Sequence, residues 1–274
     1  QVLSLSWVSK ACFVAAVWLL PQPTLAEWVQ SEGRFILTRD VSIGECFGEA
    51  TLAAKRSAMS QFGLERLSST TRDYCVDAGS QTNCELHQQT LNYFDGGYIA
   101  AVRNSRERRE FVGSNEECIV SLEADVRKFN GTPDPNLIVR AEVTGSKRKR
   151  DGELFKVEGE ATPGSFIYVF GFYPTVFGDK YFLIAPNNVD DEIKSDGGFQ
   201  IPTKQNEKRY LLEAQFPNAI KKDEVTEYLI VLALKDKLEM FGEQTSEDFH
   251  RRLHDIGRQN WQKTEVGYSI LKKE

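Results

Sequence analysis

The stretch "CIVSLEADV", Cys118–Val126, decides how the first half of the chain folds. Apart from Ile119, its residues alternate between apolar and polar, which is typical of a β-strand that has one face on a core and the other in water. The apolar positions are Cys118, Val120, Leu122, Ala124 and Val126. The stretch therefore predicts a strand that places Cys118 on its core side.

The segment 45–68 predicts the helix that covers this strand. Phe47, Ala50, Ala54, Ala58 and Phe62 recur at steps of three and four residues, which is the spacing of one helix face. Because three of these side chains are alanines, we expect the helix to lie close to the sheet.

Four cysteines follow residue 26, and all of them lie in the first half of the chain: Cys46, Cys75, Cys84 and Cys118. An even number of cysteines in an exported chain predicts two disulfides, for which three pairings exist. We favour Cys46 with Cys118, because the first begins the helix that covers the second. Cys75 then pairs with Cys84 across a polar segment that can turn. A zinc site needs closer cysteine pairs or added histidines, so it is disfavoured.

The first 26 residues predict a secretory signal peptide. Lys10 precedes an apolar run, 11–20, that is too short to span a bilayer, and Thr24-Leu25-Ala26 supplies small residues at a cleavage site. We therefore expect an exported chain, periplasmic or associated with the cell envelope, with no transmembrane span after residue 26.

A domain boundary is predicted at "KFNGTPDPN", residues 128–136, which holds two prolines and a glycine. Before it, 27–127 predicts a disulfide-stapled α+β domain with one main helix on a mostly antiparallel sheet. After it, 137–274 predicts a mainly-β sandwich with a late helix. The sandwich follows from short apolar runs separated by Gly, Pro, Asn and Asp, at 137–144, 153–160, 165–172, 180–186, 209–216 and 227–235.

The late helix is predicted over 245–262, before a last strand at 265–271. Thr245 with Asp248 resembles a capping box, and Phe249, Leu253 and Ile256 form a buried stripe.

Metal binding is weakly supported, and no cofactor is expected. His250 and His254 lie one helical turn apart, but Arg251 occupies the position where a metalloprotease motif has glutamate. The acidic loop that holds Asp190 and Asp196 fails the EF-hand pattern of calcium ligands. These four residues are the only metal candidates, and the alternative is solvated structure.

Two basic runs interrupt a chain of net charge −6, a balance that argues against nucleic-acid binding. They predict a docking patch for an acidic partner or an anionic glycan, and the alternative is a solvated hairpin end. The patch comprises Arg103, Arg106, Arg108, Arg109, Lys147, Arg148, Lys149 and Arg150.

Catalytic signatures are missing from the sequence. It holds no GxSxG elbow and no glycine-rich nucleotide-binding motif, so we expect a protein that is not an enzyme. One alternative is an exported hydrolase that uses carboxylates, or a metal near the two histidines. The other is a sandwich that binds polysaccharide by ring stacking, with candidates Tyr168, Phe170, Phe172 and Tyr173.

The stretch from about Phe155 to Leu234 resembles domain-of-unknown-function family 4384. The resemblance rests on "TPGSFIYVFGF", "KYFLIAPNN", "GGFQIP" and "EYLIVLALK", although the family's Leu-x-Pro-Asn run reads Ile184-Ala185-Pro186-Asn187 here. It implies a small exported β-sandwich without established catalytic residues.

The first domain resembles the amino-terminal module of flagellar assembly protein T and of related envelope lipoproteins. The alanine-spaced helix, "GGYIAAV" and "CIVSLEADV" carry the resemblance, while the cysteines depart from it. It implies a place in a periplasmic or outer-membrane complex. We therefore expect a non-enzymatic binding or assembly protein that acts through protein–protein contacts with envelope proteins.

Overall fold

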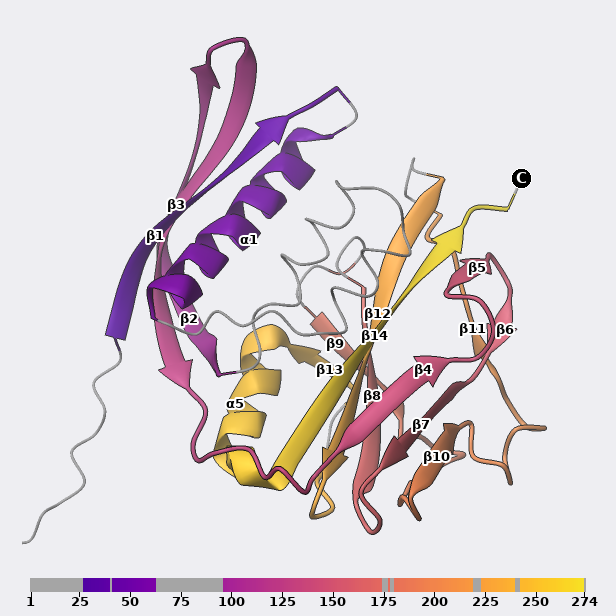
Figure 1. Cartoon of the computed structure of the whole chain (residues 1–274). Coiled ribbons are helices and arrows are strands. Elements are labelled where there is room, and N and C mark those ends of the chain that lie inside the picture. The colour runs from indigo at the N-terminus through magenta and orange to yellow at the C-terminus, as the bar shows by residue number, and fades with distance from the viewer. Residues whose placement is uncertain are drawn as a thin grey trace, which may run out of the picture.

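The computed structural model describes residues 27–39, 41–62, 96–173, 177, 180–218, 223–239 and 242–273. Over these ranges the chain is mostly β, with two α-helices and four sheets (Figure 1). This composition agrees broadly with the predicted α+β and β-sandwich classes. The predicted signal peptide, Cys75 and Cys84 lie outside the described residues, and none of the described helices is long and apolar enough to span a membrane.

The first half forms a three-stranded antiparallel sheet with a helix on one face. The elements are β1 (Glu27–Leu37), α1 (Ile43–Gln61), β2 (Gly97–Val112) and β3 (Asn115–Lys128), and the strand order is β1-β3-β2. The predicted core side of β3 is confirmed, because Cys118, Val120 and Ala124 are fully buried, but Ile119 and Asp125 on its other face are buried as well. In this strand order β3 is the central strand, and β2 is an edge.

Helix α1 lies directly on the sheet, as its alanines predict. Ser42 and Glu45 form a capping box at its start. Ala50, Ala54 and Ala58 have no exposed surface. A Cβ added to Gly33 of β1 would lie 2.1 Å from the Ala50 carbonyl oxygen, so strand and helix backbones are in contact.

The second half is built around a six-stranded sheet in the order β13-β9-β8-β12-β14-β5. A three-stranded sheet, β10-β7-β4, and a two-stranded sheet, β11-β6, complete it. The strand bounds are β4 Val139–Val143, β5 Arg148–Arg150, β6 Leu154–Phe155, β7 Val157–Ala161, β8 Phe166–Phe172, β9 Lys180–Ala185, β10 Gly198–Ile201, β11 Leu212–Glu213, β12 Glu224–Leu234, β13 Glu243–Thr245 and β14 Trp261–Leu271.

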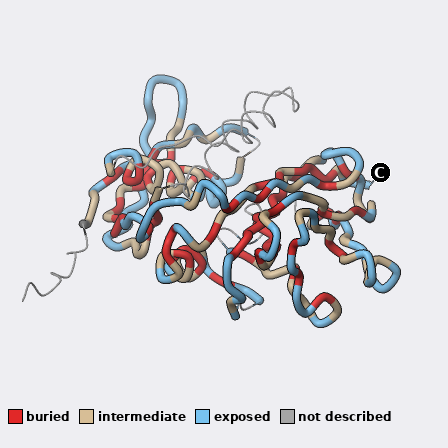
Figure 2. Tube along the Cα trace, turned by 60° about the horizontal axis from the view of Figure 1, so that its bottom comes forward, coloured by how far each residue is buried: buried red, intermediate tan, exposed pale blue. Residues whose placement is uncertain are grey.

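Two buried clusters occupy the two faces of the six-stranded sheet. Val139 of β4, Val157 of β7 and Leu229 of β12 belong to one of them. The other joins Ile230 of β12 to Ala50 of α1, so it extends from the second half into the first. Figure 2 shows the buried segments running through both halves.

The late helix is α5 (Ser246–Ile256), followed by a 3-10 turn, η1 (Arg258–Asn260). Thr245 caps it as predicted, and Phe249 and Leu253 are buried. The helix ends earlier than predicted, because Gly257 has a φ of 82°, which is outside the helical region.

The predicted strand over 209–216 is also shorter in the structure, where only β11 is extended. Residues 204–209 form turns, and the Tyr210 hydroxyl is bound to Asp190, so the first part of the run closes a loop instead of entering a sheet.

The predicted boundary at 128–136 contains a core residue. Phe129 is buried, stacks on Tyr98 of β2 with ring centroids 5.4 Å apart, and meets Trp261 of β14 edge-on at 5.0 Å. The two sides of the boundary are therefore in direct contact, and the domain division stays a prediction.

Candidate functional site

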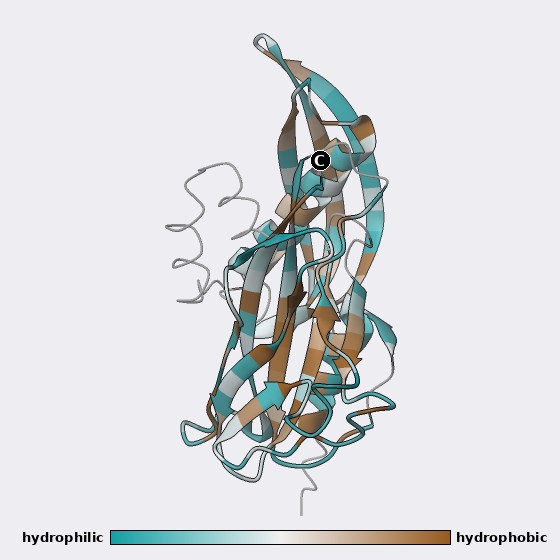
Figure 3. Ribbon diagram, turned by 90° about the vertical axis from the view of Figure 1, so that its right-hand side faces the viewer, coloured by the Kyte–Doolittle hydropathy of each residue, from teal (hydrophilic) through white to brown (hydrophobic). Residues whose placement is uncertain are grey.

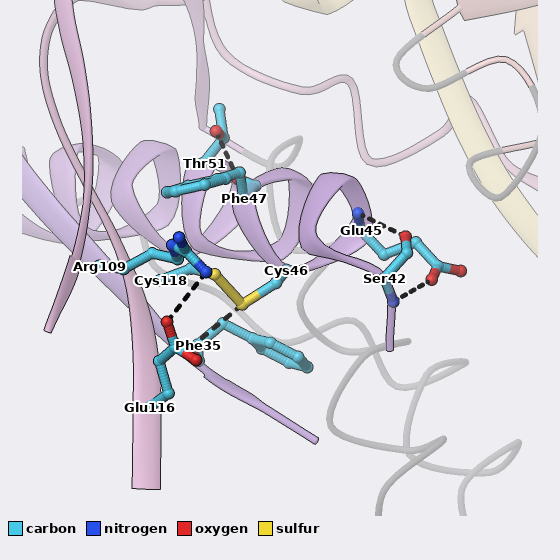
Figure 4. The surroundings of a disulfide bond; sticks show 9 residues. All are labelled: Phe35, Ser42, Glu45, Cys46, Phe47, Thr51, Arg109, Glu116 and Cys118. Carbon is cyan, nitrogen blue, oxygen red and sulfur yellow. Dashed lines mark hydrogen bonds and ion pairs between the residues drawn. A yellow bond between two sulfur atoms is a disulfide. The ribbon is translucent and has the colours of Figure 1, made fainter. Parts of the chain in front are cut away.

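The disulfide between Cys46 and Cys118 is present, as predicted (Figure 4). It joins the first turn of α1 to β3 across 72 residues of sequence, with the two Cα atoms 5.8 Å apart. Closing so long a loop removes conformations from the unfolded chain. In the folded chain, the covalent link between α1 and β3 holds the helix in place over β1 and β3.

The outer half of β2, Arg103–Val112, is the most exposed strand segment of the first half; we call it the β2 edge. All ten of its residues are exposed, whereas Gly97–Ile99 at the start of the strand are buried. Phe111, near its end, keeps 77% of its surface exposed. The hairpin of β2 and β3 reaches beyond the end of α1 (Figure 1), and its colouring in Figure 3 is largely hydrophilic.

Three of the four arginines of the β2 edge, Arg103, Arg108 and Arg109, are paired with carboxylates. Arg108 Nη2 lies 2.8 Å from Glu32 Oε2, and its Nε lies 2.8 Å from Glu110 Oε1. Arg109 lies 3.0 Å from Glu116. The hydrogen bond from Arg108 lowers the pKa of Glu32, so that carboxylate stays charged. Positive and negative side chains are therefore interspersed along this surface.

Arg103, at the inner end of the β2 edge, lies 2.6 Å from Glu123 and 3.9 Å above the ring of Trp28. Its hydrogen bond lowers the pKa of Glu123. A carboxylate and an aromatic face together hold this guanidinium against the sheet.

The second basic run lies in another sheet, so the structure does not bring the two runs together as one patch. Arg148 of β5 pairs with Glu224 at 3.0 Å. The prediction that Lys149 belongs to a surface patch was wrong, because its side chain is buried on the inner face of β5. Its ammonium donates to the Thr144 carbonyl at 2.6 Å and lies 3.3 Å from Glu153.

His250 is a buried residue of α5. Its Nδ1 lies 2.6 Å from the Ser246 carbonyl oxygen, which only accepts hydrogen bonds, so Nδ1 carries the proton. Burial lowers the pKa of His250 to about 3, which keeps the ring neutral. The ring meets those of Tyr181 and Phe249 edge-on.

His254, one turn later, packs against the first half of the chain. Its Nε2 lies 3.1 Å from the Asn130 amide nitrogen, and its ring centroid lies 5.5 Å from that of Tyr98. In the part of the chain that the structure describes, no three His, Cys, Asp or Glu side chains are grouped to hold a metal ion. The two histidines thus join α5 to β2.

Asp190 is buried, although we expected its loop to be solvated. Its carboxylate accepts hydrogen bonds from the Thr203 amide and hydroxyl, the Asn206 amide and the Tyr210 hydroxyl. Burial acts to raise the pKa of Asp190, but these hydrogen bonds outweigh it and lower the pKa. Asp190 therefore joins two loops, whereas Asp196 is exposed and accepts a hydrogen bond from the Gly198 amide.

Glu227 of β12 is a buried acid that the sequence analysis missed. It lies opposite Tyr268 of β14, whose hydroxyl donates to Glu227 Oε2 at 2.7 Å. Burial raises the pKa of Glu227 to about 7 and also raises that of Tyr268. A carboxyl group with such a pKa exchanges protons near neutrality. An acid inside the apolar run 227–235 was the only signal in the sequence.

The aromatic residues proposed for glycan stacking are mostly core. Tyr168, Phe170 and Phe172 of β8 are buried, and Phe170 meets Phe249 of α5 edge-on at 5.0 Å. Stacking requires an exposed ring face, so this set was wrong as a glycan platform. Tyr173, which follows β8, is only partly exposed.

Comparison of the sequence with protein-family models and with curated proteins gives no match.

Proposed function

We propose that the chain is an exported, non-enzymatic protein that acts in the periplasm or cell envelope through contacts with other envelope proteins. The β2 edge is its contact surface. The observation that carries this proposal is the ten-residue exposed stretch of an edge strand, which pairs on one side only among the described strands. The disulfide supports the surface, since it anchors the adjacent strand β3 to α1.

Export is supported by three features. The first 26 residues have the pattern of a signal peptide, and the Cys46–Cys118 disulfide suits an oxidising compartment. The first half also resembles an envelope module, and the second resembles a family of exported β-sandwiches. We further infer that the second half is a β-sandwich. In support, Val139 and Val157 from the smaller sheet share a buried cluster with Leu229 from the six-stranded sheet.

Site-specific photo-crosslinking in the producing cells tests the contact surface. A photoreactive phenylalanine analogue replaces Ser105 in the β2 edge, and a control chain carries it at Leu154 of β6, whose side chain is 56% exposed. We expect a protein adduct from Ser105 and none from Leu154. A Ser105 chain that crosslinks to no envelope protein contradicts the proposal, and so do equal adducts from both positions.

A hydrolase that depends on a carboxylate is the second candidate, favoured only by Glu227. A carboxyl group that titrates near neutrality suits general acid–base catalysis. The test is hydrolysis of ester and glycoside substrates by the purified protein. Activity that Glu227→Gln abolishes would select this function, and an inactive wild-type protein would exclude it for those substrates.

A further inference from the structure

Strand β2 presents an unusually long open edge. It runs for 16 residues, against roughly 5–6 for an average strand, and within the described residues it pairs only with β3. No described strand binds the amide and carbonyl groups on its other side, which is the side where an added strand would pair. Proteins commonly protect such an edge by making it short, by placing like charges on it, or by covering it.

The charges of the β2 edge follow a self-complementary order instead. A two-fold axis perpendicular to the sheet keeps each side chain on its own face, so antiparallel pairing of two copies joins residues of equal parity. With Arg108 opposite Arg108, each Arg106 meets Glu110 and each Glu107 meets Arg109. All four of these contacts join opposite charges, which stabilise a pair of strands.

Neighbouring registers are worse. Centring the pair on Glu107 opposes Glu107 to itself and Arg106 to Arg108. Centring it on Arg109 opposes Arg109 to itself, keeps only the two Arg108–Glu110 contacts and leaves Glu107 facing the ring of Phe111. The charge order thus selects the register centred on Arg108.

Arg108 can lie opposite Arg108 of the second copy because carboxylates of its own chain already balance its charge. Its guanidinium lies 2.8 Å from Glu32 and 2.8 Å from Glu110 of the same chain. In this register the paired residues are Arg106–Glu110, which lie beyond the irregularity between Arg103 and Arg106 and within the exposed part of the strand. The overlap is therefore confined to the exposed segment, and the buried start of β2 stays outside it.

We propose that the β2 edge pairs antiparallel with the β2 edge of a second copy of this chain, centred on Arg108. The two three-stranded sheets become one six-stranded sheet with both α1 helices on the same face. This inference rests on the proposed function, since it adds a second copy of the chain to the envelope proteins that contact the same surface.

Charge reversal tests the register. The exported, purified protein is studied by analytical ultracentrifugation as wild type, Arg106→Glu, Glu110→Arg and the double variant. Each single change replaces two opposite-charge contacts by two like-charge contacts, so we expect the dimer Kd to rise about tenfold or more. The double variant should return to within about threefold of wild type.

A mixture of the two single variants is the sharper test. In the mixed dimer, the glutamate at position 106 of one copy faces the arginine at position 110 of the other, so mixing should restore dimers that neither variant forms alone. Arg148→Glu is the matched control, because it reverses one exposed arginine on β5 and should leave the Kd unchanged. Circular dichroism confirms that each variant is folded.

A wild-type protein that stays monomeric, or a dimer that Arg106→Glu leaves unchanged, overturns the pairing. So does a failure of the mixture to restore dimers. These results leave the proposed function standing if Ser105 still crosslinks to another envelope protein. The proposed function fails separately, when Ser105 yields no protein adduct at all.

Discussion

The gain in stability from replacing Glu227 by Gln should grow as the pH rises. Burial raises the pKa of Glu227 to about 7 from an ordinary value of 4.5. Below pH 4.5 the group is protonated in both the folded and the unfolded chain, so it imposes no penalty. Between pH 4.5 and 7 the unfolded chain releases the proton and the folded chain keeps it, so the free energy of unfolding falls.

The magnitude follows from the separation of about 2.5 pH units. At about 1.4 kcal/mol for each unit, the ionised carboxylate destabilises the folded chain by roughly 3 kcal/mol above pH 8. The amide of Gln cannot ionise, but its oxygen still accepts from Tyr268. Relative to the wild type, Glu227→Gln should therefore gain roughly 3 kcal/mol of stability between pH 4.5 and pH 8.5.

Urea unfolding followed by tryptophan fluorescence at pH 4.5, 6, 7 and 8.5 measures this difference. Glu224→Gln is the control, because it makes the same change on the same strand at a position paired with Arg148 on the surface. If the difference between wild type and Glu227→Gln stays constant over this range, the burial argument is wrong.

His250 predicts the opposite pH dependence, because burial lowers its pKa to about 3 from 6.5. As the pH falls, His250 binds a proton in the unfolded chain but stays neutral in the folded chain. Between pH 7.5 and pH 5 the free energy of unfolding of the wild type should therefore fall by roughly 2 kcal/mol, and that of His250→Gln should not. Urea unfolding measures both. Gly33→Ala should lower the free energy of unfolding by more than about 2 kcal/mol, because its new Cβ would meet the Ala50 carbonyl oxygen at 2.1 Å. Gly48→Ala, inside α1 with no atom within 4 Å of the new Cβ, should raise it by roughly 0.5–1 kcal/mol. Thermal unfolding measures the stability of both variants. Equal effects of Gly33→Ala and Gly48→Ala would refute the close contact between Gly33 and α1.

The features predicted from the sequence were those set by local periodicity. The alternation of Cys118–Val126 gave β3 its core side, and the alanine spacing gave α1 its contact face. Together these two periodicities were sufficient to pair Cys46 with Cys118, because each fixed which side of its element faced the other. Thr245 likewise identified the start of α5.

The features that were missed depend on which segments meet across long separations. Lys149 belongs to a run of four basic residues, and only the pairing of β5 with β14 shows that its side chain points inward. Asp190 is buried because a loop more than ten residues later supplies its donors. Glu227 is an acid whose partner, Tyr268, is fixed by the register of β12 with β14. No local pattern contains this information.

Strand β2 has a buried part and an exposed part, and a change in its backbone separates them. Its first residues are buried, and Tyr98 among them packs against His254 of α5, so this part joins the two halves of the chain. Between Arg103 and Arg106 the register with β3 shifts, and Asn104 has a φ of 53°, in the region that asparagine tolerates better than most residues. Beyond the shift every side chain is exposed. Because the shift isolates the β2 edge from the core, charge reversals there should leave the fold intact, and a change in association can then be assigned to the edge itself.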